Sequence, residues 1–199
     1  MYLPLDSILS YAWMRKNHPE LLTISTSGDR LIDIDLSDVL ERREENGEFF
    51  YACSFAIGEV KGEEIQYWHK RADQSDAEKY VDFGKRKGKI DTKQGAYKSY
   101  RNPIVIKLIP KITWYVKGDK TKIEELLNYI THIGKKRSQG YGRVSRWQIL
   151  ETEEDLSHLR AIPDKNGLYY TGVRPPYWLD TNIMQASIPD DERLLCKVM

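Results

Sequence analysis

The chain has 199 residues, of which 40% are apolar and 31% charged, a composition typical of a globular domain with a hydrophobic core. No apolar run approaches the ~20 residues of a membrane-spanning helix, and no basic-then-apolar leader follows Met1, so we expect a cytoplasmic protein without membrane contact. The net charge of +1 conceals an uneven distribution, because residues 67–147 carry 20 Lys/Arg against 8 Asp/Glu and the flanking segments are acidic. A basic middle third favours an anionic partner.

The two cysteines, Cys53 and Cys196, lie far apart in the sequence, which is typical of unpaired thiols in a reducing compartment. Asp33 and Asp35, two residues apart on an expected strand, are interpreted as solvent-facing carboxylates. No His/Cys spacing resembles a zinc site, and we expect neither a metal nor another cofactor.

The N-terminal part is expected to begin with a helix at residues 5–16, where apolar side chains recur at helical spacing. Pro19 then stops the helix, because the residue before proline avoids the α region. Alternating apolar and acidic residues predict a strand at 31–36. Residues 37–45 are interpreted as a short helix capped by Ser37.

The next part favours extended structure. Residues 49–57 are aromatic-rich and predict a strand, and residues 65–71 are a weaker strand candidate. A turn at 59–64 would join the two into a hairpin.

Residues 72–101 show little apolar periodicity, and we interpret them as a long basic loop or extended hairpin. A loop of this length in a compact domain is usually functional or disordered. Residues 84–101 combine seven cations with one acid, which suits contact with phosphates. These cations are Lys85, Arg86, Lys87, Lys89, Lys93, Lys98 and Arg101.

Regular structure is expected to resume with strands at 104–109 and 111–117. Thr121 and Glu124 have the spacing of a capping box, which predicts a helix beginning at Thr121. The apolar residues of this helix recur on one face, at Ile123, Leu126, Leu127, Ile130 and Ile133.

The most informative segment follows that helix and is rich in glycine and cations. It reads Gly134, Lys135, Lys136, Arg137, Ser138, Gln139, Gly140, Tyr141, Gly142 and Arg143. Glycines permit positive φ and close approach of a ligand to the backbone, and exposed amides beside Lys and Arg suit phosphates. Tyr141 offers a ring on which a base can stack, and Ser138 and Gln139 could contact a base edge or a 2′-hydroxyl. The loop therefore favours a nucleic acid over a small metabolite.

The C-terminal part is expected to contain an apolar strand at 143–150 and a short acidic helix at 151–159. Residues 174–178 read Arg-Pro-Pro-Tyr-Trp, and two prolines exclude a regular helix or a central strand there. We interpret this segment as an aromatic strap packed over the domain.

Three segments resemble a known family. Residues 114–150, in the order strand, helix, glycine-rich basic loop, strand, are similar to the second half of a ferredoxin-like βαββαβ unit, and the loop resembles that of the RAMP superfamily of CRISPR proteins. Residues 3–13, which read Leu-Pro-Leu-Asp-Ser-Ile-Leu-Ser-Tyr-Ala-Trp, and the strap at 174–178 resemble the Cas-five-like subunit of type IV CRISPR effector complexes.

The resemblance implies an α+β fold. It would be a single ferredoxin-like (RRM-like) RAMP-type domain over residues 1–199, with a basic thumb-like insertion at 72–101 and a C-terminal extension at 151–199 packed on the core. A ferredoxin-like unit begins with a strand, and only residues 1–4 precede the first expected helix, so this strand would be very short.

The resemblance also implies a role in antiviral defence. A Cas-five-like subunit holds the 5′ handle of the guide RNA and caps the backbone of the ribonucleoprotein. The implied partners are guide RNA, Cas-seven-like backbone subunits and possibly a large subunit. We therefore expect a non-catalytic RNA-binding protein whose Lys135, Lys136, Arg137 and Arg143 contact phosphates.

Two alternatives stay open. His132, one turn before the glycine loop, or His69, between Trp68 and Lys70, could act as general base of a metal-independent endoribonuclease that processes guide-RNA precursors. Neither histidine has a second histidine beside it in a recognisable motif. The other alternative is a non-enzymatic protein-interaction domain whose basic patch binds an acidic partner.

Overall fold

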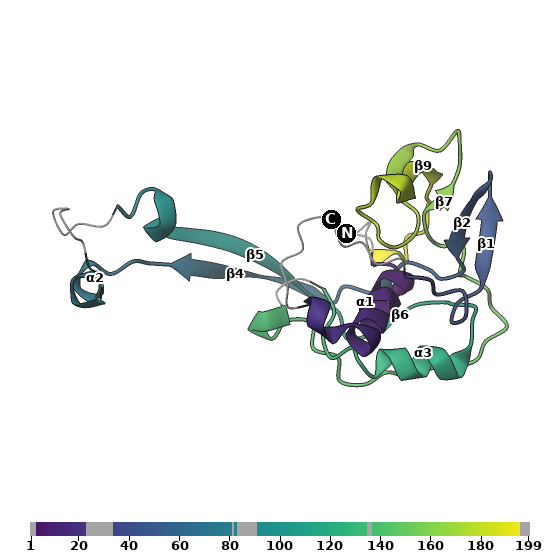
Figure 1. The fold of residues 1–199 in the computed structure, drawn as a ribbon, viewed down its shortest axis with the longest axis horizontal. Coiled ribbons are helices and arrows are strands. Elements are labelled where there is room, and N and C mark those ends of the chain that lie inside the picture. The colour runs from purple at the N-terminus through teal and green to yellow at the C-terminus, as the bar shows by residue number, and fades with distance from the viewer. Residues whose placement is uncertain (1–2, 23–33, 81, 83–90, 135–136, 196–199) are drawn as a thin grey trace. The chain divides into compact units, whose positions relative to one another are not determined.

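The computed structural model describes residues 3–22, 34–80, 82, 91–134 and 137–195, without the side chains of Ala96 and Ser138. These residues form helices and antiparallel strands, which confirms the expected α+β class (Figure 1). They divide into two compact units, one formed by Met1–Glu59 with Lys111–Met199 and one formed by Val60–Pro110. Within the described ranges, no helix is long and apolar enough to cross a membrane.

The described residues of the first unit form two α-helices, α1 (Leu5–Asn17) and α3 (Lys120–Leu127). The helix expected at 5–16 is confirmed as α1. For α3 the expected cap is wrong, because Asp119 precedes the helix and its side chain accepts a hydrogen bond from the Lys122 amide (3.1 Å). Three short 3₁₀ helices accompany these helices, at Pro19–Leu22, Arg137–Gln139 and Asp180–Asn182.

The strands of the first unit are short. They are β1 (Arg42–Glu45), β2 (Glu48–Tyr51), β3 (Ile57–Gly58), β6 (Ile112–Thr113), β7 (Ile162–Pro163), β8 (Tyr169–Gly172) and β9 (Ile183–Ser187). β1 and β2 form a hairpin whose turn residues, Asn46 and Gly47, both have positive φ (55° and 83°). The short helix expected at 37–45 is therefore wrong, because the Asn-Gly turn directs this segment into a hairpin.

Backbone pairing continues beyond these strands. Pro4 forms an antiparallel bridge with Phe55, and the Ala56 amide donates to the Leu3 carbonyl (3.0 Å). On the other side of the same segment, the Ser54 amide donates to the Tyr115 carbonyl (2.8 Å). The hairpin expected through a turn at 59–64 is wrong, since β3 pairs with β6 instead.

Two further expected elements do not form. Residues 143–150 make no strand beyond an isolated bridge at Arg143, and the half-buried Trp147 instead donates its indole N–H to the Ile130 carbonyl (3.1 Å). Residues 151–159 form turns rather than a helix, because the Asp155 carboxylate accepts from the Ser157 amide (3.1 Å) and hydroxyl (2.6 Å). Of the strand expected at 31–36, residues 31–33 lie outside the described residues and 34–36 form no strand.

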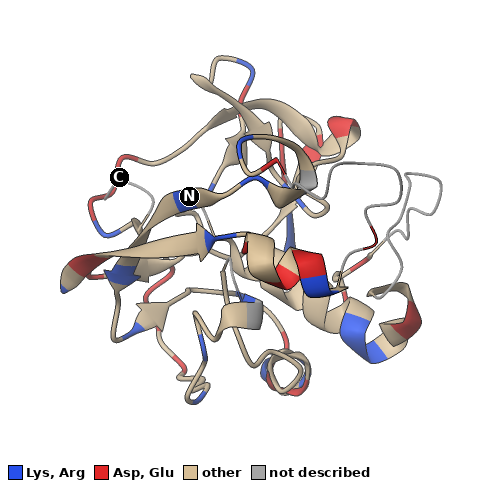
Figure 2. Ribbon diagram, turned by 90° about the vertical axis from the view of Figure 1, so that its left-hand side faces the viewer, with Lys and Arg blue, Asp and Glu red and all other residues tan. Residues whose placement is uncertain are grey.

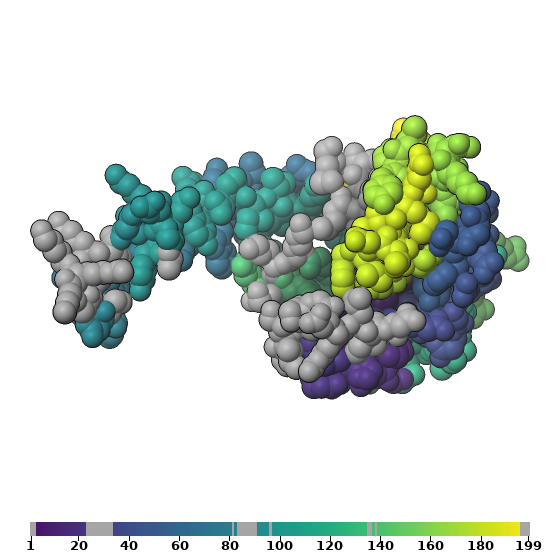
Figure 3. Space-filling model, turned by 45° about the horizontal axis from the view of Figure 1, so that its top comes forward, coloured from purple at the N-terminus to yellow at the C-terminus, as the bar shows by residue number. Residues whose placement is uncertain are grey.

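Two hydrophobic clusters hold the first unit together. The larger one joins α1, α3 and the strand segments, with Leu9, Leu36, Leu40, Cys53, Leu126 and Leu127 among its buried members. The smaller one, in the C-terminal part, contains Phe55, Leu159, Ala161, Val173, Ala186 and Leu194. Phe55 belongs to the smaller cluster and Cys53 to the larger, so one segment contributes to both. The C-terminal residues also lie beside the β1–β2 hairpin, as the yellow-green and blue surfaces in Figure 3 show.

A fully buried arginine, Arg160, connects the C-terminal part to the rest of the unit. Its guanidinium lies 3.1 Å from the Asp6 carboxylate of α1 and 2.9 Å from the Tyr177 hydroxyl, and it also donates to the carbonyls of Tyr51 and Val173. Tyr177 in turn donates to Asp6 (2.7 Å). Burial alone would lower the pKa of Arg160, but the Asp6 carboxylate and the neighbouring hydroxyl outweigh burial and raise it. Arg160 is therefore charged at every physiological pH.

Cys53 lies in the same buried network, with Sγ 3.2 Å from the Arg160 guanidinium. Burial, together with the Asp6 charge, raises the pKa of this thiol to about 12. We therefore expect Cys53 to resist iodoacetamide at pH 8 in the folded protein and to react once denaturant is added. Peptide mapping by mass spectrometry checks this, and labelling of Cys53 in native buffer at the denatured rate would contradict the burial.

The second unit is built on one long antiparallel pair. β4 (Gly62–Lys70) and β5 (Tyr100–Leu108) pair over their whole lengths, from Gly62 opposite Leu108 to Lys70 opposite Tyr100. The strands expected at 65–71 and 104–109 are thus present and longer than expected. Between them lie α2 (Gln74–Tyr80) and a 3₁₀ turn at Gly95–Tyr97, so the segment interpreted as irregular contains a helix.

Candidate nucleic-acid interface

The glycine loop projects from a short antiparallel stem. The Ile133 amide donates to the Gly142 carbonyl (2.8 Å), the Val144 amide donates to the Thr131 carbonyl (2.9 Å), and His132 bridges Arg143. Gly142 has φ +68°, and a Cβ there would lie 1.8 Å from the Ile133 carbonyl oxygen. Glycine is therefore required at this position for the stem to close.

The glycine-loop residues differ in backbone conformation and in exposure. Gly134 and Gly140 also have positive φ, and no described atom lies within 4 Å of a Cβ built on either. Lys135 and Lys136 lie outside the described residues, as does the side chain of Ser138. Arg137 and Arg143 are exposed, whereas Tyr141 and Gln139 are half-buried. The Gln139 side-chain oxygen is buried without a hydrogen-bond partner among the described residues.

A cationic hollow lies beside the stem. It has a volume of about 130 Å³ and is lined by Tyr11, Arg15, Ile130, Thr131, His132 and Arg137. The Arg137 guanidinium lies 4.6 Å from the centre of the Tyr11 ring, and Arg15 donates to the Tyr129 carbonyl (2.8 Å). His132 and Arg143 are cross-strand neighbours, and such pairs point to the same face of a ladder. Two guanidinium groups, an imidazole and a ring face thus meet at one place, which suits a phosphate and its neighbouring base.

Tyr11 and Arg15 were not expected to belong to the site. The presence of Arg15 in the last turn of α1 was explained by the helix alone, because a cation there interacts favourably with the helix dipole. One signal could have identified the pair: Tyr11 and Arg15 are four residues apart and therefore share a face of α1.

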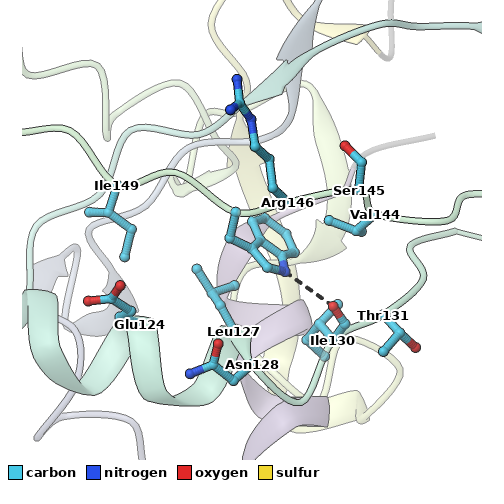
Figure 4. A pocket seen from close by; sticks show the side chains of 10 residues that line it. Glu124, Leu127, Asn128, Ile130, Thr131, Val144, Ser145, Arg146 and Ile149 are labelled. Carbon is cyan, nitrogen blue, oxygen red and sulfur yellow. Dashed lines mark hydrogen bonds between the residues drawn. The ribbon is translucent and has the colours of Figure 1, made fainter.

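A second hollow, which is also lined by Ile130 and Thr131, lies between α3 and residues 144–149 (Figure 4). Its volume is about 280 Å³, and Leu127, Ile130, Val144, Trp147 and Ile149 form its apolar lining. Glu124, Asn128 and Arg146 add both signs of charge and an amide. Because this hollow has no surplus of cations, we assign phosphate contact to the first hollow rather than to this one.

The basic segment of the second unit is described only in part. Lys85, Arg86, Lys87 and Lys89 lie outside the described residues. Lys93, Lys98 and Arg101 are exposed, and the Arg101 guanidinium stacks 3.8 Å above the Tyr67 ring. His69 is the cross-strand partner of Arg101 and is also exposed. Arg101 thus presents a cation beside a ring, the combination that the loop was expected to provide.

Charges of both signs are interspersed along the described chain (Figure 2). The basic excess of residues 67–147 therefore does not define a surface by itself, and local geometry selects the candidate residues. Within the described ranges, no group of three or more His, Cys, Asp or Glu residues is arranged to hold a metal ion.

The comparison with known families matches a model described as CRISPR type IV associated protein Csf3, over residues 1–189. The chain belongs to the Csf3 family. This is a Cas-five-like type IV CRISPR family, so the resemblance noted in the sequence is confirmed. No curated protein matches the chain.

Two of the segments that resembled this family meet in the fold. Asp6, from the N-terminal segment, and Tyr177, from the strap, share a hydrogen bond and both contact Arg160. The strap is therefore packed, as expected, with Tyr177 half-buried against Arg160 and Trp178 exposed. In this Csf3 family member, these segments build the scaffold that carries α1, and α1 supplies Tyr11 and Arg15 to the hollow.

Proposed function

We propose that this protein is a non-catalytic RNA-binding subunit that holds the 5′ handle of guide RNA and caps the backbone of a type IV CRISPR ribonucleoprotein. The observation that carries the proposal is the cationic hollow beside the glycine loop, where Arg15 and Arg137 lie with the Tyr11 ring. Phosphates of the handle would contact these arginines and Arg143, and a base would stack on the half-buried Tyr141 ring. The partners we propose are guide RNA, Cas-seven-like backbone subunits and possibly a large subunit.

We propose that the core is ferredoxin-like. In chain order, extended residues 3–4 precede α1, residues 52–58 and 112–117 pair side by side, and α3 leads to the segment that begins with the loop stem. This order supports a βαββαβ unit whose first strand is very short and whose last strand is reduced to the bridge at Arg143. The second compact unit, residues 60–110, is inserted in the chain between the second and third of its strand segments, where we propose a basic thumb that contacts RNA.

The binding proposal predicts a specific dependence on salt. Replacing Arg15 and Arg137 together by glutamine should weaken handle-RNA binding and lower the slope of log affinity against log salt by about 1.4, since each phosphate contact with single-stranded RNA contributes about 0.7. Filter binding over 50–300 mM salt, about the range over which such contacts weaken strongly, measures both quantities.

Arg42→Gln serves as the matched control, because Arg42 is an exposed arginine of β1 whose ion-pair partner is the nearby Glu44 (3.1 Å). Its slope should equal that of the unaltered chain. A double variant with an unchanged slope, or handle RNA bound no more tightly than unrelated RNA, would overturn the proposal.

A second candidate function rests on His132, which lines the same hollow as both arginines, with Nδ1 3.1 Å from the Thr131 hydroxyl. An imidazole beside cations can act as general base toward a 2′-hydroxyl. Incubation of repeat RNA with the protein in EDTA distinguishes the functions. Cleavage that His132→Ala abolishes, while RNA binding persists, would establish the endoribonuclease and reject the non-catalytic proposal.

A further inference from the structure

The three-stranded sheet of the C-terminal part has two unlike edges. Its strand order is β7-β9-β8, so β7 and β8 are the edge strands. The β7 edge is covered, because the Asn46 side chain in the β1–β2 turn donates to the Pro163 carbonyl (2.8 Å). Along β8, within the described part of the chain, no strand pairs with the side opposite β9.

The register identifies the backbone groups that face outward from β8. The Val173 amide donates to the Asn182 carbonyl (3.0 Å), and these two residues continue the β8–β9 register. Antiparallel ladders alternate, so Thr171 and Tyr169 also direct their backbone groups toward β9. The N–H and C=O groups of Tyr170 therefore point away from the sheet.

An apolar face lies beside this open edge. A Cβ on Gly172 would be 2.6 Å from the Tyr177 carbonyl oxygen, so the side-chain direction of Gly172 points toward the strap. Tyr170 shares that direction, because side chains alternate along a strand, and Leu168 lies in the bend directly before β8. Leu168, Tyr170 and Trp178, the strap residue that follows Tyr177, are 93%, 79% and 66% exposed.

Both features point to a polypeptide rather than to RNA. Residues 166–173 contain no charged side chain, whereas binding of a nucleic acid depends on cations. The edge also lacks the Lys, Pro or bulge that usually protects an exposed strand. An unpaired edge with an apolar face beside it is the geometry of strand addition, in which backbone hydrogen bonds supply affinity and alternate side chains supply specificity.

We propose that β8 is a docking site for an extended segment of another protein subunit of the same ribonucleoprotein, an occupant that rests on the proposed function. The segment would pair with Tyr170 and place uncharged apolar or aromatic residues, at every second position, against Leu168 and Trp178. Two copies of a four-residue strand bury far less than the ~1,600 Å² of a standard interface, so a second copy of this chain is not the expected occupant. A separate subunit can add contacts elsewhere.

Hydrogen exchange of the whole chain tests the proposal in three states: alone, with handle RNA, and within the complex co-expressed with the other proteins of its locus. The Tyr170 and Gly172 amides should exchange at least about tenfold more slowly in the complex than in the other two states, which corresponds to 1.4 kcal/mol. Unchanged exchange in the complex, slowing by RNA alone, or slowing that depends on the concentration of the isolated chain would each overturn it.

Tyr170→Pro removes the outward N–H without touching a β9 bond, and proline is tolerated on strand edges. This variant should fold, bind handle RNA normally and enter the complex at least about tenfold less efficiently, the ratio that 1.4 kcal/mol produces. Leu150→Ser, at another exposed apolar residue (69%), is the matched control and should assemble normally. Normal assembly of Tyr170→Pro would reject the docking site, and because RNA binding is read separately, the two proposals fail independently.

Discussion

Replacing Arg160 by methionine is expected to lower the free energy of unfolding by about 3–5 kcal/mol, the cost of breaking a fully buried ion pair from one side. Methionine keeps most of the volume but donates no hydrogen bond. The Asp6 carboxylate would then lie in the interior with the Tyr177 hydroxyl and the Ser7 amide as its remaining donors among the described residues, and the carbonyls of Tyr51 and Val173 would lose the arginine donor. Urea denaturation followed by circular dichroism measures the effect.

Arg193→Met is the matched control, because Arg193 also pairs with an aspartate, Asp191 (2.6 Å), but is half exposed. Exposed pairs contribute about 0–1 kcal/mol, so this variant should unfold nearly as the original does. If Arg160→Met does not fold, Tyr177→Phe tests the same network with a smaller perturbation. It should lower the free energy of unfolding by about 1–3 kcal/mol, because it removes one hydroxyl and leaves its partners with fewer hydrogen bonds. Equal stability of the Arg160 and Arg193 variants would contradict the role of the network.

Replacing Gly142 by alanine is expected to reduce handle-RNA affinity by at least about tenfold, equivalent to 1.4 kcal/mol, if the glycine loop binds RNA as proposed. The added Cβ would lie 1.8 Å from the Ile133 carbonyl oxygen, so the two backbones must separate and the hydrogen bond from the Ile133 amide is lost. Arg137 and Arg143 would then leave their positions at the stem. Filter binding reports the affinity, and thermal melting reports whether the fold survives.

Gly140→Ala provides the control for backbone strain. Gly140 has φ +86°, similar to Gly142, but no described atom lies within 4 Å of its Cβ position. Alanine at position 140 would therefore carry the left-handed backbone penalty of about 1–2 kcal/mol without a clash between its Cβ and another described backbone atom. An equal loss of affinity in both variants would assign the effect to strain, and an unchanged affinity in Gly142→Ala would remove the loop from the RNA site.

Local patterns were sufficient for the elements that local interactions determine. The apolar spacing of α1, the apolar face of α3 and the strand residues of β4 and β5 were readable, because periodicity follows from the geometry of each element. The Asn46–Gly47 turn was equally local and was missed, which produced the wrong helix at 37–45. The predictions for 143–150 and 151–159 failed because tertiary or side-chain hydrogen bonds outweigh the local pattern. At 143–150, Trp147 bonds to the Ile130 carbonyl and no second strand of the described chain pairs with the segment. At 151–159, the Asp155 carboxylate accepts from the Ser157 amide in place of a helical hydrogen bond.

Some residues of the candidate site could likewise be predicted from the sequence, and others could not. Arg137 and the glycines are contiguous in sequence and were identified from it, together with the family that the comparison confirms. Tyr11 and Arg15 precede them by more than a hundred residues, and nothing in their local pattern distinguishes a binding residue from a helix end.

Composition, periodicity and short motifs are local properties, and they were enough to predict the α+β class, the two main helices, the family and the loop. Only the tertiary structure decided that Asp6, Arg160 and Tyr177 form one buried network, that α1 completes the cationic hollow, and that β8 has an open edge. Each of these depends on which distant segments meet, and that is decided by burying apolar surface and pairing buried polar groups over the whole chain.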